Sequence, residues 1–342
     1  MNTTLKQRWE ALLQIKPQLR IRNAAQELKV SEAELLATKI GEYVIQLENK
    51  PKEILQEVVS LGKVMALTRN ESCVHERKGT YDNANIGKSA VGLFVGEDID
   101  LRIFFTYWQF VFAVSEISNG KERHSLQFFG KDGMAIHKIY LTPKSNYDAF
   151  AKLIKKYENK NAVPKLNILP YIEQKKYKTD QEVDILAFQK DWLALKDTHH
   201  FFSLLKKYKI SRTQALRLAP SKHEASPIDK MKIANMLEIA ASKNVPIMVF
   251  VGNRGNIQIH TGTIKKTLWH EQWFNVMDPD FNLHLNMDQV KQSWIVRKPT
   301  EDGIVTSIEC FDENGELIVQ FFGKRKPGVP ELKEWQEVIA NL

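Results

Sequence analysis

Two adjacent histidines at the start of an apolar segment carry the side chains of this chain best suited to metal chemistry. The segment reads Asp197-Thr198-His199-His200-Phe201-Phe202, and apolar residues continue at helical spacing as far as Tyr208. We expect Asp197 to be the N-cap of this helix, which puts His199 in its first turn. The positive end of the helix dipole disfavours imidazolium there, and neutral imidazole is the form that coordinates a metal. The simpler alternative is that His199 is a polar residue at an ordinary helix start.

The surroundings of His199 narrow the kind of metal site. No further histidine, cysteine or carboxylate stands at a spacing that would complete a cage around a metal ion. Helical spacing places Phe202 and Lys206 on the same flank as His199. A single histidine beside aromatic side chains suits haem, because the porphyrin supplies four more ligands to the iron.

Other short motifs in the chain are incomplete. Gly87-Lys88-Ser89 resembles the end of a phosphate loop, but Asp82 stands where the first glycine is required. His270-Glu271 begins a zinc-protease motif, yet Phe274 occupies the place of the second histidine. No Gly-x-Gly-x-x-Gly is present, so a Rossmann dinucleotide site is not supported.

The elements that must position these residues occur twice. Residues 99–114 align with residues 281–296, and residues 126–140 align with residues 308–322, both 182 positions further on. A period of this length indicates two copies of a whole domain, since solenoid repeats are much shorter. We therefore expect a first repeat at 1–160, a linker at 161–182, and a second repeat at 183–342 that carries the proximal histidine.

Each copy is expected to open with helices and continue into strands. Leu5 to Leu13 and Ile21 to Leu36 have apolar residues at helical spacing, and Ser31 before Glu34 suggests a capping box. Residues 99–105 alternate as a strand with one core face, and 126–141 indicate a hairpin turning at 131–133. Helices at 147–157 and 331–342 close the copies. The order predicts an α+β fold, with N-terminal helices packed on a large antiparallel sheet.

Composition limits the class of protein. Of the 342 residues, 43% are hydrophobic and 26% are charged, which is typical of a soluble globular protein. The net charge of +8 suits an anionic partner, but no nucleic-acid-binding module is recognisable. Residues 1–9 lack the apolar run of a signal peptide, and no apolar stretch has membrane-spanning length. Cys73 and Cys310 belong to no metal or redox motif. We expect them to be reduced core residues of a cytoplasmic protein that is not embedded in a membrane.

Three separated segments make the chain similar to a known family. They are Asp197 to Phe202, Asp98-Ile99-Asp100-Leu101-Arg102-Ile103-Phe104-Phe105, and Leu317-Ile318-Val319-Gln320-Phe321-Phe322-Gly323-Lys324-Arg325-Lys326. In their order along the chain, these segments resemble the bacterial hemin-degrading factors, the HemS/ChuS-like cytoplasmic haem proteins. The resemblance runs over nearly the whole chain and includes the duplication.

The resemblance implies a set of haem-binding residues. It places the proximal iron ligand at His199, with His200 as the fallback, and a distal arginine at Arg102. Phe104, on the same strand face as Arg102, and Phe202 are the aromatic candidates for covering the macrocycle. Basic residues around the propionates match Arg212, Arg297 and Arg325, and further pocket positions match Gln320 and Phe322. Arg297 stands where we expect lysine, which keeps the charge, and Phe322 stands where we expect tyrosine, which removes a hydroxyl donor.

The resemblance also implies a function. It points to a cytoplasmic protein that binds haem b and degrades it to release iron, with a heme oxygenase-like activity on a different fold. An external reductant such as NADH or NADPH would be needed. The alternative is a carrier that takes haem from an inner-membrane importer to a separate haem oxygenase. Arg102 corresponds to His284 in the second copy, so we expect one haem per chain, and a second site at His284 remains an alternative.

Overall fold

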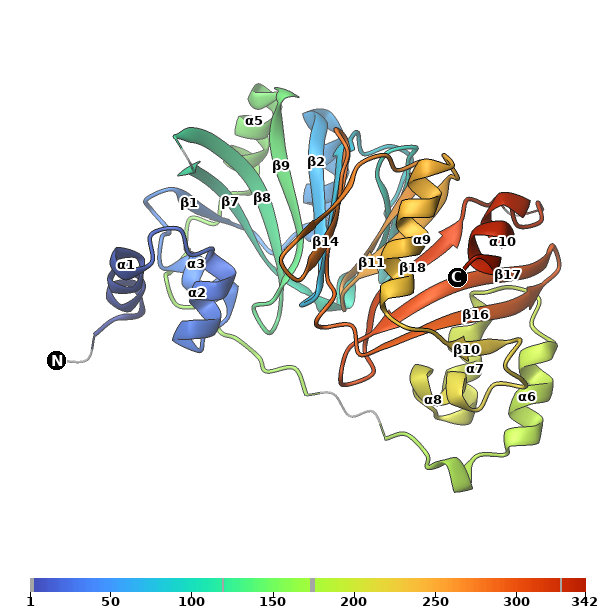
Figure 1. Ribbon diagram of the computed structural model, residues 1–342. Helices are drawn as coiled ribbons and strands as arrows, with labels where there is room; N and C mark the ends of the chain where they lie inside the picture. Colours follow the sequence, from blue (N-terminus) through green and yellow to red (C-terminus); the bar gives the residue numbers. More distant parts are fainter. Residues whose placement is uncertain (1–2, 119, 173–175, 327) are drawn as a thin grey trace. The chain divides into compact units, whose positions relative to one another are not determined.

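The computed structural model describes residues 3–118, 120–172, 176–326 and 328–342 (Figure 1). Contacts between Cα atoms divide the chain into two compact units. The first unit comprises residues up to 69 together with 76–172 and 253–258, and the second comprises 70–75, 173–252 and 259–342. The units therefore differ from two contiguous halves, because each half contributes a short segment to the other unit.

The first unit opens with three helices, α1 (Leu5–Ile15), α2 (Ile21–Leu28) and α3 (Glu32–Ala37). The apolar spacing that suggested one helix over 21–36 belongs to α2 and α3, because Lys29 adopts the left-handed conformation at φ 55° and ends α2. The capping box predicted at Ser31 and Glu34 is present and begins α3. A helix cannot pass through a left-handed residue, so the pattern breaks there.

Strands of the first unit form two antiparallel sets. One has the order β1-β7-β8-β9-β2 and the other β4-β5-β6. Two helices, α4 and α5, pack with both sets into one apolar core. The bounds of these elements are β1 (Val44–Leu47), α4 (Pro51–Val58), β2 (Gly62–Arg69), β4 (Ala84–Asn85), β5 (Val91–Val95), β6 (Asp100–Phe104), β7 (Trp108–Ser118), β8 (Lys121–Gly130), β9 (Ala135–Ser145) and α5 (Tyr147–Tyr157), with short 3-10 turns η1 (Val59–Leu61) and η2 (Phe105–Tyr107).

The second unit repeats this order. Its strands run β10-β16-β17-β18-β11 and β13-β14-β15, all antiparallel to their neighbours. The elements are η3 (Asp180–Glu182), α6 (Ile185–Leu193), α7 (His200–Tyr208), α8 (Arg212–Arg217), β10 (Ala225–Pro227), α9 (Met231–Ser242), β11 (Ile247–Gly252), β13 (Thr267–His270), β14 (Trp273–Met277), β15 (Phe281–Asn286), β16 (Gln292–Thr300), β17 (Gly303–Phe311), β18 (Leu317–Gly323) and α10 (Lys333–Ala340). The α+β architecture and the duplication are thus both confirmed.

Helices cover both faces of the β10-β16-β17-β18-β11 set in the second unit. One face packs on α9 and α10 in a core that includes Ile308, Val319 and Phe321. The other face packs on α6, α7 and α8 through Trp294 and Val296 of β16. Along β18, buried and half-buried residues alternate, so Gln320 and Phe322 point away from the α9–α10 core.

The two predicted hairpins have the same geometry. β8 pairs with β9 around Gly133 at φ 72°, and β17 pairs with β18 around Gly315 at φ 75°. Each glycine also lies against the start of a helix, because a Cβ on Gly133 would collide with Ser31, and one on Gly315 would come 2.9 Å from Thr213 Oγ1. The turn glycines are needed both for the left-handed backbone and for this close approach.

The segments exchanged between the halves begin with equivalent asparagines. β3 (Cys73–Gly79) and β12 (Asn256–Gly262) follow Asn70 and Asn253, which are 183 positions apart. Asn70 Nδ2 donates to the carbonyls of Gly252 and Ile318 at 3.1 and 2.8 Å, all within the second unit. Asn253 Nδ2 donates to the carbonyls of Arg69 and Ile136 at 2.9 and 2.8 Å, all within the first unit. The same bonds therefore anchor both exchanged segments.

Both cysteines are free and buried, as predicted. Cys73 and Cys310 lie in the core of the second unit, and burial raises the pKa of the Cys310 thiol. Among the described residues, no helix is both long and apolar enough to cross a bilayer.

Candidate functional site

The turn that carries the two histidines lies just before α7. Asp197 is not the N-cap that the sequence suggested, because its carbonyl accepts from His200 N at 3.1 Å in a tight turn and the helix starts at His200. Its side chain serves the histidine instead. Asp197 Oδ1 accepts from the backbone N–H of His199 at 2.8 Å and contacts His199 Nδ1 at 2.7 Å. The backbone N–H bond from His199 is the main cause that lowers the pKa of Asp197.

Metal-binding histidines commonly have the second ring nitrogen bonded to a carboxylate, as in this contact. A carboxylate that accepts from Nδ1–H fixes the ring and its tautomer, and the other ring nitrogen, Nε2, is then the one that binds a metal. The His199 side chain is 88% exposed, so the ring is accessible. Phe202 is 60% exposed on the same helix, with Lys206 Nζ 4.5 Å from the centre of its ring.

Phe201 connects this turn to a group of buried charges. Its side chain is buried, and its ring packs edge-on against Trp192 at 4.8 Å. Lys298 Nζ lies 4.5 Å and Arg212 Cζ 5.2 Å from its centre. The aromatic ring therefore places the start of α7 beside two cations.

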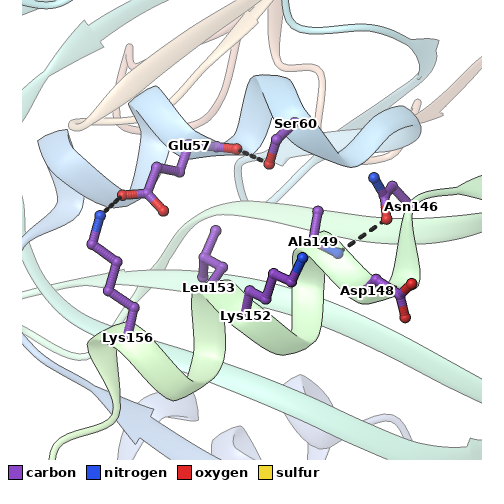
Figure 2. A pocket seen from close by; sticks show the side chains of 8 residues that line it. All are labelled: Glu57, Ser60, Asn146, Asp148, Ala149, Lys152, Leu153 and Lys156. Carbon is purple, nitrogen blue, oxygen red and sulfur yellow. Dashed lines mark hydrogen bonds and ion pairs between the residues drawn. The ribbon is translucent and has the colours of Figure 1, made fainter.

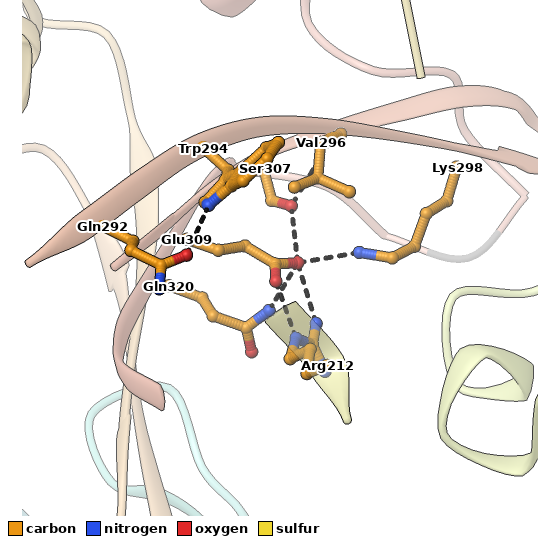
Figure 3. Close-up of polar contacts among 8 residues, drawn as sticks. All are labelled: Arg212, Gln292, Trp294, Val296, Lys298, Ser307, Glu309 and Gln320. Atoms are coloured by element: carbon orange, nitrogen blue, oxygen red, sulfur yellow. Dashed lines mark hydrogen bonds and ion pairs between the residues drawn. The ribbon is translucent and has the colours of Figure 1, made fainter. Parts of the chain in front are cut away.

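Those cations belong to a carboxylate-centred cluster formed by Glu309 with Arg212, Lys298, Ser307 and Gln320 (Figure 3). Arg212, the first residue of α8, donates from Nε and Nη2 to the two oxygens of Glu309 at 2.6 and 2.7 Å. Lys298 of β16 donates to the same carboxylate at 2.8 Å, and Gln320 of β18 donates at 3.0 Å. The hydrogen bond from Gln320 follows from the antiparallel register of β17 and β18, in which Glu309 stands opposite Gln320.

The charges of the cluster are unequal, with two cations and one carboxylate. Burial alone would raise the pKa of Glu309, but Arg212 and Lys298 outweigh that effect and hold this pKa well below its usual range. Burial lowers the pKa of Lys298 to about 8, and the neighbouring Arg212 adds to the effect. One positive charge is left in excess, which favours an anionic ligand such as a carboxylate.

The structure brings together Arg212 and Gln320 of the predicted pocket, but it separates them from Arg297. Arg297 Nη1 donates to the carbonyl of His223 at 2.9 Å, on the opposite side of β16 from the cluster. Lys298, which follows Arg297 in the chain, and Glu309 were not among the pocket residues predicted from the sequence. Alternation along β16 was the signal that could have found Lys298, because it shares a face with Val296.

Arg325 and Phe322 lie near the end of β18. Arg325 Nη2 is 3.5 Å from Asp302 Oδ2, and its Nε atom is buried without a hydrogen-bond partner among the described residues. Phe322 packs against Phe250 at 5.1 Å and shares a strand face with Gln320. A buried guanidinium nitrogen without a partner fits a site for a carboxylate ligand.

Arg102 and Phe104 lie on β6 of the first unit. Leu101 and Ile103 face the core, and both predicted residues are half-buried on the other side of the strand, as the alternation implied. Arg102 forms an ion pair with Asp100, and it also donates to the carbonyl of Leu101 at 3.2 Å. Burial raises the pKa of Asp100 although the charge of Arg102 opposes it.

The first unit holds a different set of charges at the position of the cluster. Its equivalent of Arg212, the first residue of α3, is Glu32, which pairs with buried Lys138. Lys138 stands opposite Gln127, as Gln320 stands opposite Glu309. The helix thus supplies the acid in one unit and the base in the other. His284, the candidate for a second site, contacts Asn275 Oδ1 at 2.7 Å on β14.

The Gly87-Lys88-Ser89 segment and a hollow in the first unit both lack the groups that would bind a porphyrin. At Gly87-Lys88-Ser89, three carbonyls rather than N–H groups converge on Lys52 Nζ, which is the wrong polarity for a phosphate loop. A hollow of about 410 Å³ in the first unit is lined by charged and polar residues, among which Glu57 and Lys156 pair with each other (Figure 2). No histidine lines it, and among the described residues no three His, Cys, Asp or Glu side chains gather as a metal site.

Comparison with known proteins supports a haem-related family. Residues 29–157 and 209–342 match the family model described as a haemin-degrading HemS.ChuX domain. The chain is 36% identical to the hemin transport protein HmuS of Yersinia pestis, over all of this chain and 98% of that protein.

Solved structures agree over the full length of the chain. The holo form of PhuS, a heme-binding protein from Pseudomonas aeruginosa, is 44% identical with a TM-score of 0.95, covering 98% of this chain and 96% of PhuS. ChuS, described as a heme oxygenase of E. coli, is 33% identical with a TM-score of 0.89, covering 99% of both chains. The duplicated α+β fold and these matches together show that the chain belongs to the HemS/ChuX family of haemin-degrading proteins.

Proposed function

We propose that this protein binds haem with His199 as the axial ligand and opens the macrocycle to release its iron. The observation that carries the proposal is the contact between Asp197 and His199 Nδ1, beside the exposed ring of Phe202 and close to a cluster with an excess positive charge. The printed descriptions of PhuS as heme-binding and of ChuS as a heme oxygenase support it.

Each residue then has a defined task. Asp197 orients the His199 ring, and Phe202 packs on the macrocycle. Arg212, Gln320 and Arg325 would bind the propionates, with Phe322 as a further pocket residue on the strand face of Gln320, while Arg102 would hydrogen-bond the distal ligand beside Phe104. Haem supplies the redox chemistry, and the protein binds and orients it. The electrons come from an external reductant, for which NADH and NADPH are the candidates, and the cytoplasm is the expected location.

A second candidate function is haem transfer. The relative HmuS is described as a hemin transport protein, which favours a carrier between an inner-membrane importer and a downstream haem oxygenase. Both functions use the same binding residues, so only the fate of bound haem distinguishes them.

One experiment tests both functions. Haemin is added to the protein, binding is confirmed by a Soret band that is shifted and sharpened relative to free haemin, and ascorbate or NADPH is then supplied in air. Loss of the haem spectrum with release of iron and an open-chain tetrapyrrole supports degradation. A stable ferrous spectrum supports the carrier, and a Soret band unchanged from that of free haemin contradicts both.

The axial ligand is tested in the same assay. His199→Ala should shift the Soret band and weaken haem binding, whereas His270→Ala, at an exposed position on β13, should change neither. An unchanged spectrum for His199→Ala with a changed one for His200→Ala would move the ligand one residue along the chain.

A further inference from the structure

Glu309 is the residue on which the whole carboxylate-centred cluster depends. Its side chain is 0% exposed, and its two oxygens accept bonds from Arg212, Lys298, Ser307 and Gln320. Four of the donating atoms meet at Oε1, which leaves Oε2 to the Nε atom of Arg212. A buried carboxylate with this many donors holds each of them at a fixed position.

The contact with Arg212 uses only one edge of the guanidinium. Nε and Nη2 point to Glu309, and a guanidinium has five N–H groups in a planar fork. The edge that includes Nη1 remains for a second carboxylate. Arg212 is 22% exposed, so that a ligand can reach it, and Phe201 packs 5.2 Å from its central carbon. The guanidinium is therefore held on one edge and on one face.

We propose that Glu309 is a positioning residue, which fixes the guanidinium of Arg212 and the amide of Gln320 in the orientation that binds a carboxylate of haem. The inference rests on the proposed function and adds to it the residue that preorganises the propionate site. Such preorganisation raises affinity because the donors lose little freedom when the ligand arrives.

Glu309 has two opposing effects on haem affinity, so the direction in which Glu309→Gln changes that affinity tests the proposal. A buried carboxylate between two cations also reduces the positive charge that attracts an anionic ligand. If neutralisation were its only effect, Glu309→Gln would strengthen haem binding. If positioning dominates, the same substitution weakens binding although the cluster gains net positive charge.

The test compares haemin with haemin dimethyl ester, in which both propionates are esterified. Glu309→Gln should weaken haemin binding at least about tenfold, the loss expected for one charge-assisted hydrogen bond. The ester should bind the unmodified protein and Glu309→Gln with equal affinity, because it lacks the carboxylates that Arg212 is proposed to bind. Glu238→Gln, an exposed position on α9 with the same change in charge, should leave the affinity for both ligands unchanged.

Two more variants separate positioning from stability. Glu309→Asp keeps the charge but shortens the reach to Arg212, so it should fold and should still bind haemin more weakly than the unmodified protein does. In an Arg212→Met background, Glu309→Asp should have a smaller effect on haemin binding, since the guanidinium that Glu309 positions is gone and only the amide of Gln320 is left.

The outcomes are distinct. Haemin binding by Glu309→Gln as tight as or tighter than in the unmodified protein overturns the proposal, as does an equal loss for haemin and its ester. If Glu309→Gln does not fold, unchanged haemin affinity in Glu309→Asp overturns it. A Soret band that the unmodified protein leaves unchanged from that of free haemin would remove the proposed function and this inference together, whereas a shifted band with no selective loss removes the inference alone.

Discussion

At the scale of single residues, the half-buried arginines Arg102 and Arg325 have different partners, and this difference predicts different roles. Arg102 is paired with Asp100 on its own strand, so its charge is partly compensated before any ligand arrives. Arg325 has a buried Nε atom without a partner among the described residues and a distant contact with Asp302 at 3.5 Å. Arg325 therefore has more to gain from a bound carboxylate than Arg102 has.

The first prediction separates binding from turnover at these two arginines. Arg102→Ala should retain most of the haem affinity and lose haem degradation, on the order of a hundredfold, because a donor to the distal ligand matters most as charge develops. Arg325→Ala should instead weaken haem binding by at least about tenfold. Haem titration and degradation rates measure both effects, with Arg8→Ala as a control on α1 of the first unit. Equal losses of affinity, without a separate loss of turnover in Arg102→Ala, would make Arg102 a binding contact and favour the carrier.

The second prediction concerns acid stability and His137. This histidine is fully buried among Thr68, Tyr81 and Asn256, and burial lowers its pKa to about 3. Between about pH 6.5 and pH 3 the unfolded chain therefore binds a proton that the folded protein does not, so the free energy of unfolding falls as the pH falls through this window.

The measurement compares the native protein with His137→Gln, which cannot titrate. Urea unfolding should show the native protein losing about 2 kcal/mol more than the variant between pH 7 and pH 5. His270→Ala, which changes an exposed histidine, should follow the native protein. Identical pH dependence in the native protein and His137→Gln would show that folding leaves the pKa of His137 near its ordinary value.

At the scale of elements, the exchanged segments depend on two side chains. Asn70 Oδ1 accepts from the backbone N–H groups of Ser72 and Cys73 at 3.0 and 2.9 Å. Asn253 Oδ1 accepts from those of Gly255 and Asn256 at 3.0 and 3.1 Å. With the two donated bonds of each amide, the side chain joins the turn before the strand to the unit that receives the segment.

The third prediction is that both asparagines stabilise the fold by a similar amount. Asn70→Ala and Asn253→Ala should each lower the free energy of unfolding by about 2 kcal/mol or more, because each leaves several backbone groups without a partner. Asn314→Ala, at an exposed turn position, should stay within about 0.5 kcal/mol of the native protein. Chemical denaturation provides the measurement, and a neutral effect at either position would show that the exchanged segment is held by its strand alone.

At the scale of the whole molecule, duplication of the fold has not duplicated the charges. Glu116 of the first unit is equivalent to Lys298 of the second, 182 residues further on. Glu116 stands opposite Arg123 in the strand register, and Lys298 stands opposite Val305, which is again 182 residues after Arg123. Together with Glu32, Lys138 and Arg123, this gives the first unit two acids and two bases. The second unit has two bases and one acid at the same place.

The fourth prediction follows from this difference in charge. Haemin titration should end at one equivalent per chain, because the first unit lacks the excess positive charge that attracts the propionates in the second unit. His284→Ala should leave this endpoint unchanged, whereas His199→Ala should shift the Soret band and weaken binding at the single site. Two equivalents in the native protein, reduced to one in His284→Ala, would establish the second site instead.

The sequence by itself determined the features that depend on local periodicity. The duplication, the α+β class, the hairpins at Gly133 and Gly315, and the capping box at Ser31 all follow from spacing within a few residues or from a repeated pattern. The two faces of β6 were predictable for the same reason, because side chains alternate along any strand. The proximal role of His199 and the distal role of Arg102 remain predictions, which rest on the family resemblance.

Only the tertiary structure decided which distant side chains meet. Arg212, Lys298 and Glu309 are far apart in sequence, and their contact depends on how α8 packs on β16 and β17. Asp197 suited an N-cap locally, yet an intervening tight turn made it the partner of His199. The exchange of residues 70–75 and 253–258 was equally hidden, because strand pairing between distant segments is set by the packing of whole sheets and leaves no local pattern.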